Sequence, residues 1–128
     1  INASGGEVVT RLAAIPHLLH TQPQIGWIGL TEAQARAEGY DVRTGSFDLA
    51  YNARSITLGA RQGLVKLVTE RSMGQIIGVH VVGPEASELL AVVATAMQAE
   101  MTVDDLAVAV HWHPSMAEAL VAAARRAR

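Results

Sequence analysis

Two β-rich runs separated by four turn residues are the feature that most constrains the fold of this 128-residue chain. The runs cover 63–70 and 75–82, and the intervening residues 71–74 give a loop length suited to a β-hairpin. Lys66 interrupts the apolar side chains of the first run. The pattern therefore predicts an antiparallel pair with one partly solvated face.

A long apolar helix is predicted directly after this hairpin, over 85–100, because Gly83-Pro84 ends the second run. Its apolar side chains cover more than one stripe of the helix surface: Leu89, Leu90, Val92, Val93, Ala96, Met97 and Met101. A helix that is apolar nearly all round must be covered on more than one side. One sheet supplies one cover, and we expect another subunit to supply the second.

The other elements follow from periodicity and capping signals. Residues 48–62 are predicted to be irregular, whereas strands are expected over 15–21, 25–30 and 40–47, and helices over 31–39, 102–110 and 116–126. Alternating βαβ units are absent, which favours the α+β class, with a mainly antiparallel sheet covered by helices. We expect one domain over 15–128, preceded by residues 1–14 as the poorly defined edge of a fragment.

Composition narrows the functional classes. A net charge of -2 and a pI near 6.2 give no electrostatic case for binding nucleic acid or a membrane surface. The absence of cysteine excludes disulfides, zinc-thiolate sites and a thiol nucleophile within these residues. No apolar run reaches the roughly 20 residues of a membrane span, and a cytoplasmic location is expected. The basic cluster Arg125-Arg126-Arg128 is interpreted as a solvated helix end.

The stretch from His111 to Glu118 carries the best candidate chemistry. Ser115 and Glu118 have the S-x-x-E spacing of a capping box, which predicts Ser115 as the N-cap of the last helix. Pro114 favours an extended approach for His113, so the His ring can fold back within reach of the Glu118 carboxylate. Such a carboxylate fixes the imidazole tautomer and leaves the other ring nitrogen as an acid or base. The plainer alternative is a helix cap preceded by an incidental histidine.

His111 has two interpretations of its own. It is either a partly buried histidine that caps the preceding helix or, with His113, half of a metal site. Residues i and i+2 of an extended segment face the same side, but two ligands are too few for a closed zinc site. The other histidines, at 17, 20 and 80, lie on predicted strands, and nothing in the sequence places them near this pair.

Four segments occur in an order that resembles the C-terminal dimerisation domain of the pyridine nucleotide-disulfide oxidoreductases. They are residues 24–32, 63–67, 77–88 and 111–118. The last is most similar to the H-x-H-P-T-x-S-E pattern with which dihydrolipoamide dehydrogenases typically end. The resemblance extends from about residue 15 to the end of the chain.

Members of that family are homodimeric flavoenzymes with an FAD domain, an NAD(P) domain and this interface domain. The resemblance implies that His113 is the active-site base and Glu118 its orienting carboxylate. It also implies that His113 and Pro114 lie against the flavin of the partner subunit, with a cis His113-Pro114 bond. The reaction implied is dihydrolipoamide plus NAD⁺ to lipoamide plus NADH, and the enzyme could serve a 2-oxoacid dehydrogenase complex.

The chain also departs from the family pattern. Ser115 stands where the family usually has Thr, and Ala117 where it usually has Ser. There is no G-x-G-x-x-G motif and no cysteine pair, so this chain alone is expected to bind no FAD or NAD(P) and to be inactive. Glutathione reductase-like and other disulfide reductases share the His-Pro and Glu pattern and stay as alternatives, as does a stand-alone dimeric interaction module with no catalytic duty.

Overall fold

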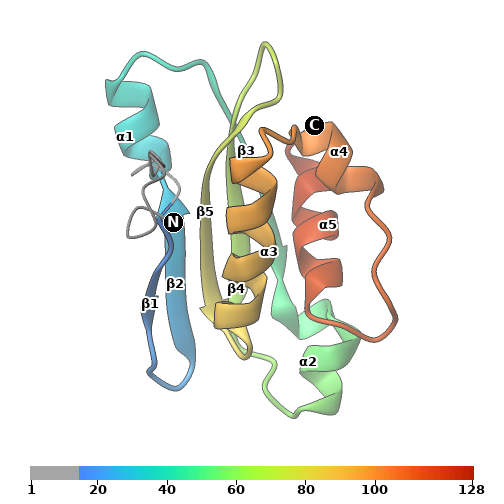
Figure 1. Ribbon diagram of the computed structural model, residues 1–128. Helices are drawn as coiled ribbons and strands as arrows, with labels where there is room; N and C mark the ends of the chain where they lie inside the picture. The colour runs from blue at the N-terminus through green and yellow to red at the C-terminus, as the bar shows by residue number, and fades with distance from the viewer. Residues whose placement is uncertain (1–14) are drawn as a thin grey trace, which may run out of the picture.

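A five-stranded antiparallel sheet forms the centre of the molecule (Figure 1). The computed structural model describes residues 15–128, so the edge predicted over 1–14 lies outside the described residues. The strands follow the order β1-β2-β5-β4-β3 across the sheet. Their bounds are β1 (His17–Leu19), β2 (Gln24–Gly29), β3 (Val42–Asp48), β4 (Leu64–Glu70) and β5 (Ile76–Gly83). The predicted α+β class with a mainly antiparallel sheet is confirmed.

The predicted hairpin is the β4–β5 pair, with one buried and one partly solvated face. Val65 pairs with Val81, and all of their side-chain surface is buried or nearly so. Lys66 pairs with His80 on the opposite face, where both are half-buried. Gly74 closes the turn at φ +69°, a left-handed conformation that glycine adopts without steric cost.

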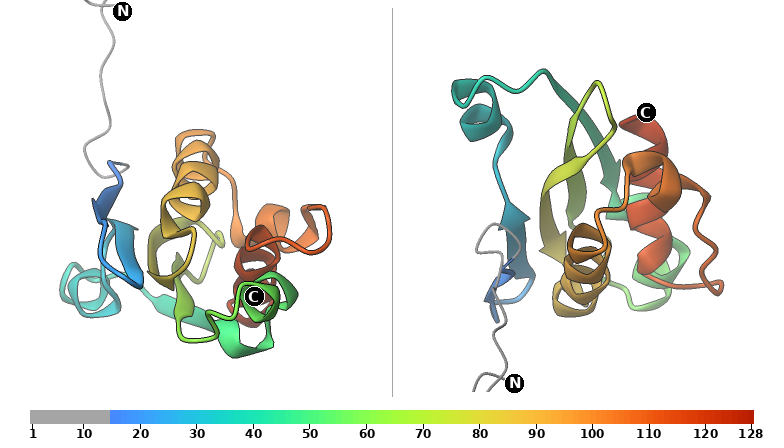
Figure 2. Two further views of the ribbon diagram at one scale, coloured as in Figure 1. Left: turned by 90° about the horizontal axis from the view of Figure 1, so that it is seen from below. Right: turned by 45° about the horizontal axis from the view of Figure 1, so that its top comes forward.

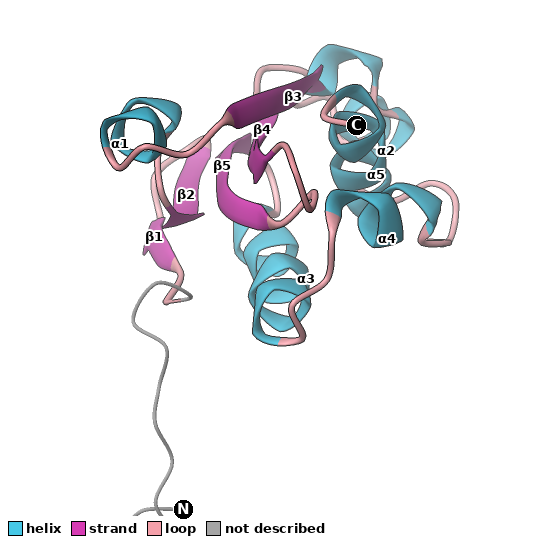
Figure 3. Ribbon diagram, turned by 90° about the horizontal axis from the view of Figure 1, so that it is seen from above, coloured by secondary structure: helices cyan, strands magenta, loops and turns pink. Residues whose placement is uncertain are grey.

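Helices cover mainly one face of this sheet, as Figures 2 and 3 show. Helices α3 (Ala86–Gln98) and α5 (Ala117–Arg126) pack on the strands, and α4 (Val103–Val108) packs on α5. Helix α1 (Glu32–Ala37) lies over one end of the opposite face and buries a second, small cluster. Among the described residues no helix combines the length and apolar character needed to cross a membrane.

The contact of α5 with β3, here called the seam, brings a helix backbone directly against the sheet. It comprises Gly45 of β3 and the buried residues Leu120, Ala123, Ala124 and Ala127. A Cβ atom on Gly45 would overlap the Ala123 carbonyl oxygen and the Ala127 amide nitrogen. Small residues on both sides therefore let the two backbones approach each other.

Helix α3 is covered within the chain at the positions expected to need another subunit. Val93 is completely buried, and Val92 and Met97 are half-buried against the same core. The helix contacts β2, β5 and α5, which together supply more than one cover. Its exposed positions include Thr95 and Gln98. Val93 is therefore covered without a second subunit, whereas the expectation that another subunit packs on this helix stays a prediction.

Residues 48–62 are more regular than the sequence predicted. They form a 3-10 helix, η3 (Leu49–Tyr51), and a short helix, α2 (Ala53–Thr57). The Asp48 carboxylate accepts a hydrogen bond from the Ala50 amide at 2.8 Å, and the Asn52 side chain caps α2. Two consecutive N-caps therefore order a segment that has little apolar periodicity.

The C-terminal arginines are exposed, but they are not simply solvated. Arg125 Nε donates to the Ala107 carbonyl at 3.1 Å, and Arg126 donates to the Ser46 carbonyl at 2.7 Å. Arg128 pairs with Asp104 at 2.6 Å. Each arginine therefore joins α5 to α4 or β3, which corrects the interpretation of a solvated helix end.

Candidate active site

The segment that joins α4 to α5, residues 109–114, positions the candidate chemistry, and we call it the strap. It has no regular secondary structure and ends in a cis peptide bond between His113 and Pro114, as the resemblance implied. A second cis bond, between Gln22 and Pro23, was not predicted. The strap delivers His113 to the first turn of α5.

His113 and Glu118 form the predicted pair. His113 Nδ1 lies 2.9 Å from Glu118 Oε1, which is hydrogen-bonding distance. The His113 side chain is 71% exposed and the Glu118 side chain 35%. His113 Nε2 makes no hydrogen bond within residues 15–128. The pair therefore has one nitrogen occupied by a carboxylate and the other available at the surface.

The capping box expected at Ser115 is only half formed. The Ser115 amide donates to Glu118 Oε2 at 2.9 Å, as a capping box requires. However, the helix begins at Ala117 with Met116 as its N-cap, and no side chain caps it. Ser115 Oγ is buried and has no hydrogen-bond partner among the described residues. The prediction of Ser115 as N-cap was wrong, because Met116 takes that position and the Ser115 hydroxyl bonds none of the α5 amides.

Asn52 is the site residue that sequence reasoning missed. Its side-chain amide donates to the Ser115 carbonyl at 3.0 Å, while its oxygen accepts from the Ser55 amide at 3.0 Å. The side chain is almost completely buried. An Asn before a short helix is a recognisable N-cap, but the contact with Ser115, 63 residues away, has no local signal. Asn52 thus joins α2 to the end of the strap.

The surroundings of Glu118 favour its ionised form. The Ser115 backbone N–H and the His113 ring together hold the pKa of the Glu118 carboxyl below its ordinary value, and the charge of His111 adds a weaker effect. Hydrogen bonds to a carboxylate stabilise the charged state. An ionised Glu118 can only accept in this contact, so His113 Nδ1 is the nitrogen that carries the hydrogen.

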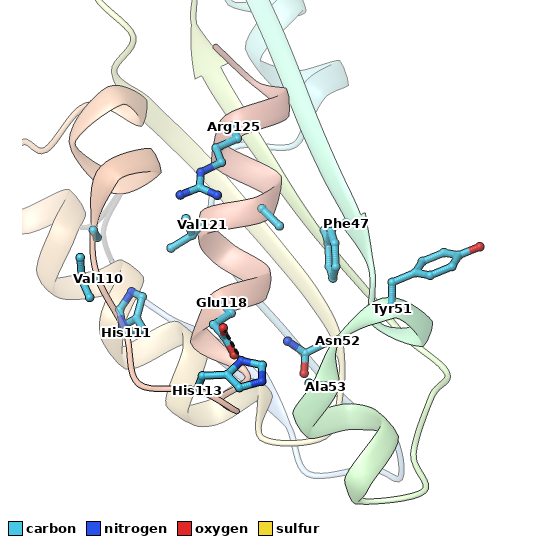
Figure 4. Close-up of a pocket in the computed structure, with 12 residues that line it drawn as sticks. Phe47, Tyr51, Asn52, Ala53, Val110, His111, His113, Glu118, Val121 and Arg125 are labelled. Carbon is cyan, nitrogen blue, oxygen red and sulfur yellow. Dashed lines mark hydrogen bonds and ion pairs between the residues drawn. The ribbon is translucent and has the colours of Figure 1, made fainter.

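A pocket of about 440 Å³ opens along the outer side of α5 (Figure 4). Its floor is a helix stripe at i, i+3, i+4 and i+7, comprising Glu118, Val121, Ala122 and Arg125. The strap forms one wall, and η3 with the end of β3 forms the other. The dyad lies at one end of this pocket and Arg125 at the other, as Figure 4 shows.

His111 lies in the same pocket as His113, on the side of the strap that faces α5. Its Nε2 is buried without a hydrogen-bond partner within residues 15–128. In the described part of the chain no three His, Cys, Asp or Glu side chains are arranged to hold a metal ion. The two imidazoles therefore share a pocket but form no metal centre in the residues described.

The fold and site define a class: a helix-covered antiparallel sheet that presents a His–Glu pair but carries no thiol of its own. The family model for "Pyridine nucleotide-disulphide oxidoreductase, dimerisation domain" matches residues 15–124. The chain belongs to this family.

Relatives agree with that assignment. The chain is 40% identical over 110 residues to the dihydrolipoyl dehydrogenase of Thermus scotoductus, covering 86% of this chain and 24% of the relative. It is 32% identical to the mitochondrial dihydrolipoyl dehydrogenase of Sus scrofa, covering 91% and 23%. The crystal structure of LpdA from Mycobacterium tuberculosis superposes with a TM-score of 0.88 at 36% identity, covering 98% and 28%. The chain spans about a quarter of the length of these proteins.

Proposed function

We propose that this chain is the dimerisation domain of a homodimeric, FAD-dependent enzyme like dihydrolipoyl dehydrogenase, and that it supplies His113 and Glu118 to the partner subunit's active site. The observation that carries the proposal is the 2.9 Å contact between His113 Nδ1 and Glu118 Oε1. The relatives named dihydrolipoyl dehydrogenase support the choice of reaction.

In this proposal His113 acts as the base for a dithiol substrate. Its Nε2 accepts the proton of one substrate thiol, and Glu118 stabilises the resulting imidazolium through Nδ1. The thiolate is the nucleophile; it attacks one sulfur of a disulfide in the partner subunit, so that the S–S bond breaks and the other sulfur leaves as a thiolate. The second substrate thiol loses its proton to solvent and attacks the substrate sulfur of this mixed disulfide. The substrate disulfide forms, the mixed disulfide bond breaks, and the partner subunit keeps two reduced sulfurs and the two electrons.

The strand topology of this chain indicates that the cofactors are bound by other domains. The described strands pair only in antiparallel fashion, and the dinucleotide fold requires parallel strands with a glycine-rich turn. FAD and NAD⁺ would therefore be held by other domains, where they supply the electron transfer from the dithiol to nicotinamide. The exposed His113-Pro114 turn would border the flavin of the partner.

The test uses the full-length polypeptide that carries this chain, assayed for NAD⁺ reduction by dihydrolipoamide. We expect His113→Gln to lower kcat by roughly 10²- to 10⁴-fold, the usual contribution of a positioned acid or base, with flavin absorbance unchanged. Glu118→Gln should cost less, because Glu118 orients His113 without touching the substrate. His20→Gln is the matched control, since His20 is an exposed histidine in the β1–β2 turn.

Two results would refute the proposal. Full activity in His113→Gln would remove the catalytic role, and equal losses in the His113 and Glu118 variants would refute the division of roles between them. A parallel assay with NADPH and glutathione disulfide separates the lipoamide reaction from that of a glutathione reductase-like enzyme. Turnover only with glutathione disulfide would reassign the substrate while keeping the dyad.

A further inference from the structure

Arg125 differs from the other two arginines at the end of α5, because most of its hydrogen-bond donors are unused. Arg126 and Arg128 are engaged, one with a backbone carbonyl and the other with a carboxylate. Arg125 donates through Nε to the Ala107 carbonyl at 3.1 Å. Within residues 15–128 its two Nη atoms have no hydrogen-bond or ion-pair partner. Because every N–H of a guanidinium is a donor and the group stays charged, Arg125 keeps a free cationic fork.

The bond to Ala107 holds this fork at one end of the pocket that contains the dyad. Arg125 and Glu118 lie on the same stripe of α5, and the rise of the helix separates them by about 10 Å along its axis. Figure 4 shows Arg125 and the dyad at opposite ends of this pocket. The pocket therefore has a base at one end and a cation at the other.

The walls between these two ends are mainly apolar. Val121 and Ala122 form the floor, Ala109 and Val110 of the strap lie on one side, and Phe47 lies on the other. Burial of methylene groups against such side chains is favourable. The pocket thus suits a molecule with a thiol at one end, a short aliphatic chain in the middle and a hydrogen-bond acceptor at the far end.

The charges in the pocket favour a carboxylate as that acceptor. Glu118 is already engaged by His113 and by the Ser115 amide, and in the described part of the chain no acid pairs with Arg125. A carboxylate can take two parallel N–H···O bonds from a guanidinium, and such charge-assisted bonds are stronger than those to a neutral group. An amide offers one neutral oxygen and gains less.

We propose that Arg125 determines substrate specificity by binding the carboxylate of an acidic dithiol. The enzyme would then prefer dihydrolipoate, the free acid, to the neutral dihydrolipoamide. This inference rests on the proposed function and specifies the substrate class of the same site. Because Arg125 holds the end of the substrate that does not react, it contributes equally to the bound substrate and the transition state. Its loss should therefore raise KM and leave kcat unchanged.

The experiment measures NAD⁺ reduction by the full-length polypeptide with each of the two dithiols at saturating NAD⁺. We expect Arg125→Gln to raise KM for dihydrolipoate roughly 10-fold or more, as for a lost hydrogen bond to a charged group. KM for dihydrolipoamide and both kcat values should change little. Arg125→Lys keeps the charge without the fork and should recover part of the loss.

Arg126→Gln is the matched control. It removes the same charge from the next residue, whose side chain donates to the Ser46 carbonyl and does not line the pocket. Neither KM should change in this variant. The native enzyme offers a test that needs no variant: added salt screens exposed charges, so KM for dihydrolipoate should rise with ionic strength while KM for dihydrolipoamide stays constant.

Three results would overturn the inference while the enzyme still turns over. They are a native kcat/KM that is equal for the two dithiols or higher for the amide, an unchanged KM for dihydrolipoate in Arg125→Gln, and an equal rise of both KM values in that variant. The last result would mean that Arg125 serves only to join α5 to α4 through Ala107. The proposed function fails differently, through an active His113→Gln variant or through no turnover with either dithiol.

Discussion

Two of the contacts of helix α5 differ in kind: the seam with β3 on its inner side and the strap on its outer side. In the seam, Leu120 and Ala123 are completely buried, and Gly45 leaves no room even for a methyl group. At the strap, His113 and Trp112 are largely exposed, and a few hydrogen bonds fix the turn that carries them. The residues that stabilise the fold and those that carry the candidate chemistry therefore lie on opposite sides of α5.

We therefore expect substitutions in the seam to change mainly the free energy of unfolding. Substitutions in the strap should change mainly the activity. A buried seam resists any added atom because its neighbours are backbone. An exposed strap tolerates side-chain changes but depends on the bonds that set its direction. The largest expected effect belongs to the seam.

Gly45→Val should destabilise the fold more than any strap variant. The new side chain would overlap the Ala123 carbonyl oxygen and the Ala127 amide nitrogen, and backbone atoms cannot move aside without displacing α5. Overpacking of this kind costs about 1–3 kcal/mol and sometimes more. We expect at least about 3 kcal/mol less free energy of unfolding, measured by urea denaturation.

Gly26→Ala is the matched control for that experiment. A Cβ at Gly26 meets mainly the Leu90 Cδ1 atom, the end of a flexible side chain of α3. It should therefore cost clearly less than Gly45→Ala measured in the same way. Equal costs would show that the seam is no tighter than the rest of the helix–sheet contact.

Asn52 provides the intermediate case, because it is buried yet supports the strap. Asn52→Ala removes the donor to the Ser115 carbonyl and the acceptor for the Ser55 amide. Leaving buried polar groups unpaired costs about 1–3 kcal/mol. Urea denaturation should show a loss within that range.

Asn52→Asp separates the two roles of this side chain. Asp keeps an oxygen for the Ser55 amide but places another oxygen against the Ser115 carbonyl, where the donor used to be. We expect Asn52→Asp to remain as unstable as Asn52→Ala. Recovery to the stability of the native chain would mean that the α2 cap alone carries the effect and that the strap does not depend on Asn52.

Local sequence signals predicted most of the fold because its elements satisfy local rules. The β4–β5 hairpin follows from two β-rich runs and a four-residue gap, and α1 and α4 begin at Thr31 and Thr102, where complete capping boxes form. Where packing across the sheet decides, local patterns give less. Helix α3 packs on β2 and α5, which are distant in sequence, as well as on the adjacent β5.

The site shows the same limit. Spacing and the proline that follows His113 placed its ring against the Glu118 carboxylate, and the structure has that contact. The Ser115 hydroxyl was misplaced because α5 begins at Ala117, one residue later than the S-x-x-E spacing predicts. Asn52 could not be found from local pattern, since its bond to Ser115 spans 63 residues. Short-range pairs are readable from sequence, whereas the supports that orient them come from the tertiary fold.

The smallest predicted effect on stability concerns the charge of Glu118. Its pKa is held below the ordinary value of 4.5 by the Ser115 amide and by His113. A carboxyl whose folded pKa is lowered contributes stability above its unfolded pKa, and this contribution is lost as pH falls through the folded pKa. The difference in unfolding free energy between the native chain and Glu118→Gln should thus be largest at about pH 7 and shrink as the pH drops below about 4.5.

Glu118→Gln isolates charge because a glutamine oxygen can still accept from the Ser115 amide. Glu38→Gln, at the exposed end of α1, controls for the general loss of a surface carboxylate and should show no comparable pH dependence. A difference that stays constant from neutral to acidic pH would mean that Glu118 supports the turn only as a hydrogen-bond acceptor. In that case the charge of Glu118 would matter for His113 alone and would contribute nothing to the stability of the fold. The seam would then stabilise the fold, and the charge carried beside the strap would serve only the candidate chemistry.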